Sequence, residues 1–150
     1  MQYVSIYRVQ LMKTGTFPIE SKMIKSPDMA AAACRGFITH EYGGYMPDRE
    51  VLGVIWLNTK NVMVGAEVVS IGSVNASIAH PREVFKSGIL HNASSFIVFH
   101  NHPSGDTRPS EEDVKVTRRL SEAGELIGIE LMDHIILGEG HKSLKAEGHL

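Results

Sequence analysis

The sequence predicts an α/β fold in which a mixed β-sheet is flanked by helices. Segments rich in β-branched and aromatic residues alternate along the chain with segments of helical periodicity. One strand-like segment, Glu50–Leu57, is apolar throughout after its first residue, as expected for a strand buried on both faces. The length of 150 residues suits one continuous core, so we expect residues 1–150 to form a single domain.

The first half of the chain contains clear start and stop signals. Tyr3–Leu11 mixes β-branched and aromatic residues in short alternations and predicts a first strand. Ser26-Pro27-Asp28 supplies an N-cap, a proline at the first helical position and an acid in the first turn, and Gly43-Gly44 should end that helix. Glu50–Leu57 then predicts a central strand, followed by a turn at Asn58–Asn61.

The second half continues the alternation. The expected elements are a returning strand over Val62–Ile71, a helix from Pro81 that stops before Asn92, a strand over Ser95–His100, a helix from Ser110 to about Gly124, and a last strand over Leu131–Leu137. The order of strands in the sheet does not follow from these patterns.

Composition narrows the function classes. A hydrophobic fraction of 43% and a charged fraction of 21% are ordinary for a globular protein, and no apolar run reaches the roughly 18 residues of a membrane span. We therefore expect no membrane association. The N-terminus has no basic segment followed by an apolar stretch, which favours a cytoplasmic protein over an exported one.

Cysteine content and charge restrict the cofactors and partners. Cys34 is the only cysteine, which excludes an internal disulfide or a zinc site of several thiolates, so histidines and carboxylates must hold any metal. In its Ala-rich helix it is expected to be a small buried thiol. The formal net charge of −2 provides no overall attraction to phosphate backbones, so nucleic acid is not the expected partner.

Three residues around one strand end form a candidate metal site. Side chains alternate along a strand, so His100 and His102 face the same side, about 7 Å apart along the chain. Asp113, one turn inside the next helix, shares the inward face with Val116 and Leu120. Two imidazoles and one carboxylate leave a tetrahedral Zn²⁺ with one open position, which is typical of a catalytic site that activates water.

Two further residues are candidates for the chemistry itself. Glu50 begins the apolar strand at the edge of the core, where a carboxylate could take a proton from water and pass it to a leaving amine. Ser110 precedes Asp113 by three residues and could form a hydrogen bond with the attacked oxygen or with the metal-bound water. We predict a loss of rate rather than of metal when Ser110 is replaced.

Structural interpretations compete with each of these assignments. Ser110-x-x-Asp113 is also a helix-capping pattern, and a His-x-His pair alone is a weak metal signal. Glu50 could instead pair with Arg49 or Arg82. His80 and His134 are expected to serve structure, the first as a cap for the helix at Pro81 and the second as a strand residue with a satisfied ring.

The spacing matches a known motif. His100-x-His102, seven residues and then Ser110-x-x-Asp113, with Glu50 upstream, resembles the JAMM motif of the MPN domain metalloproteases. Within that superfamily, the segments 100–105, 109–110 and 133–138 resemble those of the RadC-like proteins. The resemblance covers roughly Asp48 to Leu150.

The resemblance implies a fold, a cofactor and two alternative functions. The fold would be similar to that of cytidine deaminases, with Zn²⁺ at a strand end and Glu50 beside it. Members of the superfamily hydrolyse peptide or isopeptide bonds, so a zinc-dependent metallohydrolase acting on a peptide or protein substrate is the preferred expectation. The alternative is a DNA-repair or mobile-element-associated protein that processes nucleic acid with the same zinc site.

The resemblance also bears on partners. Longer RadC-like chains carry a helix-hairpin-helix segment suited to DNA binding, and we expect no such domain here, which lowers the support for direct DNA binding. Free strand edges could permit a homodimer.

Overall fold

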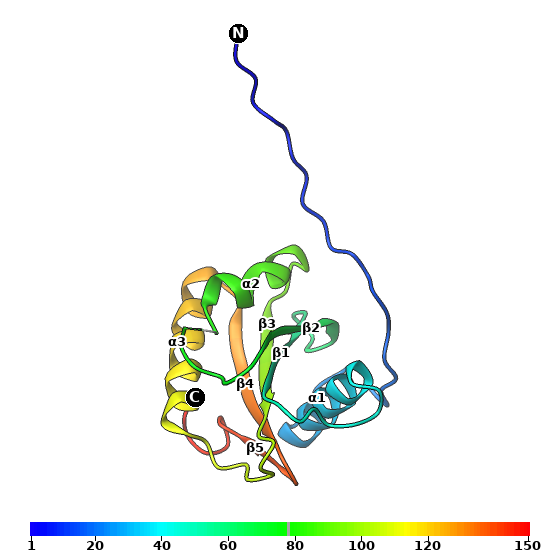
Figure 1. Cartoon of the computed structure of the whole chain (residues 1–150), viewed down its shortest axis with the longest axis vertical. Helices are drawn as coiled ribbons and strands as arrows, with labels where there is room; N and C mark the ends of the chain where they lie inside the picture. Colours follow the sequence, from blue (N-terminus) through cyan, green and yellow to red (C-terminus); the bar gives the residue numbers. More distant parts are fainter. Residues whose placement is uncertain (78) are drawn as a thin grey trace.

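The computed structural model describes residues 1–77 and 79–150 and contains the expected mixed sheet with helices on both sides (Figure 1). Its elements are α1 (Pro27–Glu41), β1 (Val51–Leu57), β2 (Met63–Ile71), α2 (Pro81–Leu90), β3 (Ser95–Asn101), α3 (Glu111–Ile127), β4 (Glu130–Leu137) and β5 (His141–Ser143). The strand order is β2-β1-β3-β4-β5. The pair β3–β4 is parallel and the other pairs are antiparallel.

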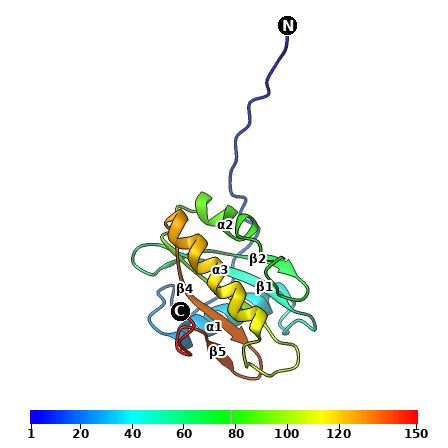
Figure 2. The ribbon, with the colours of Figure 1, turned by 90° about the vertical axis from the view of Figure 1, so that its left-hand side faces the viewer.

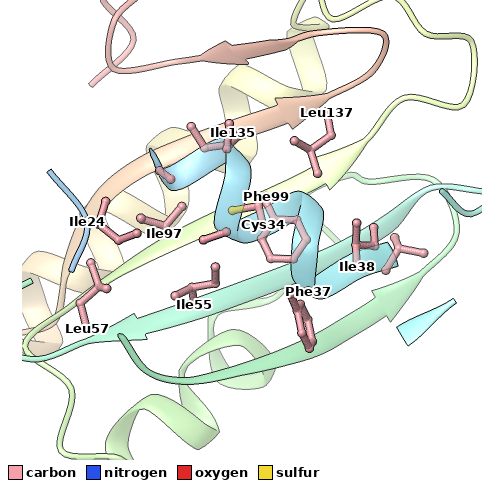
Figure 3. Close-up of a cluster of buried hydrophobic side chains, with 14 residues drawn as sticks. Ile24, Cys34, Phe37, Ile38, Ile55, Leu57, Ile97, Phe99, Ile135 and Leu137 are labelled. Carbon is pink, nitrogen blue, oxygen red and sulfur yellow. The ribbon is translucent and has the colours of Figure 1, made fainter. Parts of the chain in front are cut away.

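One face of the sheet is covered by α1. Figure 3 shows Cys34 and Phe37 of α1 packed with Ile55, Ile97 and Ile135, which come from three neighbouring strands. Cys34 is completely buried, as expected for a small packed thiol. Burial raises the pKa of the Cys34 thiol, and the charge of Asp133 raises it further, so the thiol stays protonated.

The other face is covered by α2 and α3 (Figures 1 and 2). Trp56, Phe85 and Phe96 form an aromatic cluster on this face, with ring centroids 5.0–6.2 Å apart. The indole N–H of Trp56 donates to Ser87 Oγ at 2.7 Å, which satisfies a buried donor. Every residue of β1 and β3 is buried between the two layers, which confirms the prediction of central strands.

Most predicted boundaries agree with the structure to within one or two residues. Ser26 caps α1 by accepting the N–H of Met29 at 3.2 Å, and His80 caps α2 by accepting the N–H of Arg82 at 3.2 Å. β1 begins at Val51, so Glu50 lies just before the strand rather than inside it. The predicted helix from Ser110 to about Gly124 was too short. Gly124 is a buried residue within α3, and the left-handed residue that ends the helix is Gly128, at φ 87°.

The predicted strand at Tyr3–Leu11 is wrong. These residues are exposed and extend away from the domain without pairing (Figure 1). A segment of strand-like composition forms a strand only when it pairs with another strand, and none of the described strands lies beside this segment. Among the described residues, no helix combines the length and apolar character needed to cross a bilayer.

Candidate metal centre

The two histidines and the acid meet where β3 ends and α3 begins. His100 is the second-last residue of β3, and His102 follows the strand directly. Asp113 is the third residue of α3. β3 lies between β1 and β4 in the sheet, so the site sits at the end of a central strand. The structure therefore brings together the three residues predicted as metal ligands.

The potential ligand atoms converge on one point. His100 Nε2 lies 3.1 Å from Asp113 Oδ1, and His102 Nε2 lies 3.1 Å from Asp113 Oδ2. The two Nε2 atoms are 3.0 Å apart. The side chain of His102 is 15% exposed, whereas those of His100 and Asp113 are 0% and 3% exposed, so the group is accessible from the His102 side.

The chemistry of the donor set fits a cation. His102 Nδ1 lies 2.7 Å from the carbonyl oxygen of Asp106, and because a carbonyl can only accept, this nitrogen carries the proton. In the neutral ring the Nε2 lone pair then faces the carboxylate of Asp113, with no proton between them. Lone pairs that face one another in a buried site are stabilised by a positive ion, so His100, His102 and Asp113 could hold a metal.

The capping interpretation of Ser110-x-x-Asp113 is confirmed, and the geometry also leaves Asp113 facing the candidate metal centre. Ser110 Oγ accepts the N–H of Asp113 at 3.1 Å, and Asp113 Oδ2 accepts the N–H of Ser110 at 2.8 Å, which is a complete capping box. The same carboxylate faces both histidines. The start of α3 therefore fixes the orientation of the acid, while the hydroxyl proton of Ser110 remains free to be donated.

The titration of two groups reflects these surroundings. Burial raises the pKa of Asp113, but the hydrogen bond and charge of His100 and the N–H of Ser110 outweigh it, and the pKa lies well below its usual range. Burial lowers the pKa of His134, with a further contribution from His100, so this ring is neutral. The carboxylate of Asp113 thus provides the negative charge of the centre.

Glu50 is held at the same end of the sheet. In the antiparallel β1–β3 pair Leu52 lies opposite His100, so Glu50, two residues earlier, is on the same face of the sheet as the histidine. Its Oε2 accepts the N–H of Val74 at 2.7 Å, and this contact replaces the expected alternatives with Arg49 or Arg82. Glu50 is therefore anchored by backbone rather than by a salt bridge.

Asn101 positions the segment that carries Glu50 and was not singled out from the sequence. Its Oδ1 accepts the N–H of Val51 at 2.8 Å, and its Nδ2 donates to the carbonyl of Arg49 at 3.0 Å. Both residues adjoin Glu50, so the side chain between the two histidines clamps the backbone on each side of the acid. The position of an asparagine between two candidate ligands is the sequence signal that could have identified it.

His134 lies against the centre although the sequence indicated only a satisfied strand residue. Its Nε2 is 2.8 Å from His100 Nδ1, and its Nδ1 is 2.6 Å from Thr117 Oγ1. The ring is satisfied, as predicted, and one of its partners is a candidate metal ligand. A histidine in the buried strand β4 was the available signal.

Comparison with known proteins assigns the family. Residues 24–149 match the model of the RadC-like JAB domain. A UPF0758 protein of Syntrophomonas wolfei is 47% identical over 128 residues, which cover 85% of this chain and 54% of the relative. A UPF0758 protein of Clostridium acetobutylicum is 49% identical over 132 residues, covering 87% and 55%.

A UPF0758 protein of Methanosarcina acetivorans is 56% identical over 101 residues, covering 67% of this chain and 44% of the relative. The chain spans about half the length of these curated relatives. The match covers both the strand end with the two histidines and the helix start with the acid. The chain therefore belongs to the RadC-like JAB domain family of the JAB/MPN superfamily.

Proposed function

We propose that this protein is a zinc-dependent hydrolase that cleaves amide bonds of the peptide or isopeptide type. The observation that carries the proposal is the convergence of two imidazole nitrogens and one carboxylate within 4.8 Å at a buried strand end. His100, His102 and Asp113 would hold the ion. When bound, Zn²⁺ supplies a Lewis acid that polarises a carbonyl and lowers the pKa of a coordinated water.

Glu50 is the proposed proton carrier. It lies two residues before Leu52, which is opposite His100 in the sheet, and its Oε2 accepts the N–H of Val74. Anchoring through one oxygen leaves the carboxylate able to accept a proton from water and to deliver it to a leaving amine. The clamp by Asn101 supports this role because it limits movement of the backbone on both sides of Glu50.

Ser110 is the proposed hydrogen-bond donor to the attacked carbonyl oxygen. Its Oγ accepts the Asp113 N–H, which directs the hydroxyl while leaving its proton available. A preorganised donor stabilises the negative charge that develops on this oxygen in the transition state. Ser110 therefore has a structural and a chemical role in the proposal.

A peptide or protein substrate is preferred over nucleic acid. The chain carries a formal net charge of −2, and two of the three cationic side chains of α3 have partners: Lys115 lies 3.5 Å from Glu112, and Arg119 donates to the carbonyl of Ala76 at 2.7 Å. These cations are less available to phosphates. Processing of nucleic acid with the same centre is the alternative outcome of the test.

The test combines metal analysis with hydrolysis. Wild-type protein, purified with zinc, is expected to retain the ion and to cleave peptide or isopeptide substrates that release a fluorescent amine. His102→Ala should lose most of the zinc, while Glu50→Gln should keep the zinc and lose about 10²- to 10⁴-fold in rate. Glu125→Gln, an exposed acid of α3, is the matched control and should change neither quantity.

Two results would contradict the proposal. One is wild-type protein that stays metal-free under zinc supplementation. The other is hydrolysis that persists unchanged in Glu50→Gln. DNA binding that weakens steeply with salt, together with zinc-dependent DNA cleavage, would favour the nucleic-acid alternative.

A further inference from the structure

His100 can act as a ligand only in one of its two neutral forms. Its Nε2 faces Asp113 and His102, and its Nδ1 lies 2.8 Å from His134 Nε2. A metal binds the nitrogen that carries the lone pair, so the proton of the neutral ring must sit on Nδ1. The groups behind His100 therefore decide whether it can coordinate an ion.

The chain of hydrogen bonds behind the ring has one consistent arrangement of protons. Thr117 Oγ1 donates to the carbonyl oxygen of Asp113 at 2.7 Å, because that oxygen can only accept. A hydroxyl has a single proton, so the Thr117 oxygen must accept at its contact of 2.6 Å with His134 Nδ1. His134 thus carries its proton on Nδ1 and its lone pair on Nε2.

The same logic extends to the ligand. His134 Nε2 accepts the proton of His100 Nδ1, and the lone pair of His100 is left on Nε2, directed at Asp113. His100, Thr117 and His134 are each 0% exposed, so bulk water cannot offer alternative partners. A second proton on His134 would place an additional charge in the buried layer, which is costly.

We propose that Thr117 and His134 are positioning residues that fix the tautomer of His100, so that its Nε2 lone pair is presented to the ion. The functional consequence rests on the proposed zinc hydrolase. The tautomer is a property of the metal-free protein and can be measured without any hydrolysis.

Thr117→Val tests the proposal because valine keeps the shape and removes the hydroxyl. The full-length protein is titrated with Zn²⁺ against a chelator, and the imidazole nitrogens of the metal-free protein are observed by ¹⁵N NMR, with His100 assigned through a His100→Gln variant. Thr117→Val should weaken zinc affinity about 10- to 100-fold, as is typical for groups that orient ligands. Thr117→Ser should restore most of it.

Thr39→Val is the matched control. Thr39 Oγ1 donates to the carbonyl of Arg35, four residues earlier, at 2.7 Å. This bond is equivalent to that of Thr117 with the carbonyl of Asp113, but it lies in α1, away from the centre. It should leave zinc affinity unchanged. NMR should show the proton of His100 on Nδ1 in the wild type and a mixture of forms in Thr117→Val.

The outcomes separate this inference from the proposed function. Folded Thr117→Val with wild-type zinc affinity, or a wild-type His100 protonated on Nε2, would overturn the inference even if Glu50→Gln abolishes hydrolysis. Conversely, the expected tautomer and affinities in a protein that hydrolyses nothing would leave the inference intact and refute the hydrolase.

A second, independent observation concerns the exposed segment Tyr3–Leu11, the N-terminal arm. Val4 is 93% exposed, Ile6 97% and Tyr7 87%, and the arm extends away from the domain (Figure 1). Its composition is apolar and β-branched, unlike that of segments that remain disordered because they lack apolar residues. Burial against a partner would remove this apolar surface from water.

The outer edge of β2 offers a complementary surface. β2 forms one edge of the sheet and has 9 residues, whereas β5, at the opposite edge, has 3. Only the start of this edge is used in the described chain, where the N–H of Met63 donates to the carbonyl of Lys22 at 2.8 Å. A groove of about 720 Å³ separates the segment 11–22 from the first half of β2.

The register at the start of this edge does not place the arm on β2 of its own chain. Met23 pairs antiparallel with Val62, so each step back from Met23 advances one residue along β2. Continuing that register would place residues 14–21, and not the arm, opposite residues 64–71. We infer that the arm adds as a strand to β2 of a second copy, and that reciprocal exchange closes a dimer.

The oligomeric state of the full chain tests this inference. Sedimentation should show a concentration-dependent dimer, and hydrogen exchange should show arm amides that gain protection as concentration rises. Ile6→Asp should weaken the dimer at least 10-fold. Leu126→Asp, a matched apolar residue that is 90% exposed on α3, should not. A protein that is monomeric throughout, or a dimer that Ile6→Asp leaves intact, would overturn the inference.

Discussion

The two histidines of the metal centre are held in different ways. His100, on the sheet side, is fully buried, and its outer nitrogen contacts His134 of β4. His102, on the loop side, is 15% exposed, and its outer nitrogen contacts a backbone carbonyl of the segment that leads to α3. Both rings present Nε2 to Asp113, but one is oriented by packed side chains and the other by a loop.

This difference separates two requirements of a metal centre. The sheet side holds the ring of His100 in one orientation, because the ring is fully buried and its Nδ1 contacts His134. The loop side provides access, because a substrate can approach only where the centre is exposed. Variants on the two sides should therefore lower the free energy of unfolding of the metal-free protein by different amounts, even where both abolish metal binding.

The largest effect is expected at Asp113, which serves both sides. Asp113→Ala removes a ligand and half of the capping box, so zinc affinity should fall at least 100-fold and the metal-free protein should lose about 0.5–2 kcal/mol of unfolding free energy. Asp113→Asn retains a cap acceptor but not the charge, and should lose mainly the affinity. Chelator titration and urea unfolding measure the two quantities.

Asp28→Ala provides the control, because Asp28 lies in the first turn of α1 without facing the centre. It should leave zinc affinity unchanged. Equal zinc affinity in Asp113→Ala and Asp28→Ala would show that Asp113 only caps its helix.

The second prediction compares the two histidines directly. His100→Ala leaves the Nε2 of His134 without its partner in a buried site and should destabilise the metal-free protein by about 1–3 kcal/mol. His102→Ala removes a partly exposed ring and should cost less, although both variants lose zinc. Urea unfolding of chelated protein gives the ranking, and a reversed order would refute the distinction between the sides.

The third prediction concerns pH. Because burial lowers the folded-state pKa of His134, the associated stability is fully present above the unfolded pKa of about 6.5 and is lost as the pH falls toward the lowered folded value. The loss is up to about 1.4 kcal/mol per pH unit. Unfolding of metal-free protein from pH 7.5 to 5 should show this slope, and His134→Gln should flatten it. An unchanged slope in the variant would contradict the assignment.

The smallest effect is expected in the loop. Gly105 has φ 87°, and an added Cβ would lie 3.0 Å from Glu139 Cγ, so Gly105→Ala should cost about 1 kcal/mol and loosen the segment that holds His102. Gly140→Ala, whose added Cβ meets nothing within 4 Å, is the control. Thermal unfolding and zinc titration measure both. Wild-type stability in Gly105→Ala would show that the loop tolerates a different backbone.

Local sequence rules were sufficient to identify the three metal-binding candidates. His100 and His102 follow from strand alternation, and Asp113 follows from the first turn of a helix. The sequence could not choose between capping and metal binding at Asp113. In the structure one carboxylate completes the capping box and also faces both histidines, because Oδ2 accepts the Ser110 N–H beside His102 while Oδ1 lies beside His100.

Other parts of the site depend on distant contacts. Glu50 was proposed from its place at the start of an apolar strand. Its position on the same face of the sheet as His100 comes from the β1–β3 register. The contact of His134 with His100 requires β4 to lie beside β3. The contact of His134 with Thr117 requires α3 to pack against β4. Strand order is a property of the whole sheet, and no pattern within one segment encodes it.

Sequence patterns were enough to predict the alternation of helices and strands, the buried central strands and the donor set of the candidate metal centre. These features depend on periodicity and on residues close together in the chain. The strand order, the hydrogen bonds behind His100 and the unpaired state of Tyr3–Leu11 became known only from the folded chain. The physical reason is that hydrogen bonds between strands and between buried rings join residues far apart in sequence, and they exist only once the sheet has assembled.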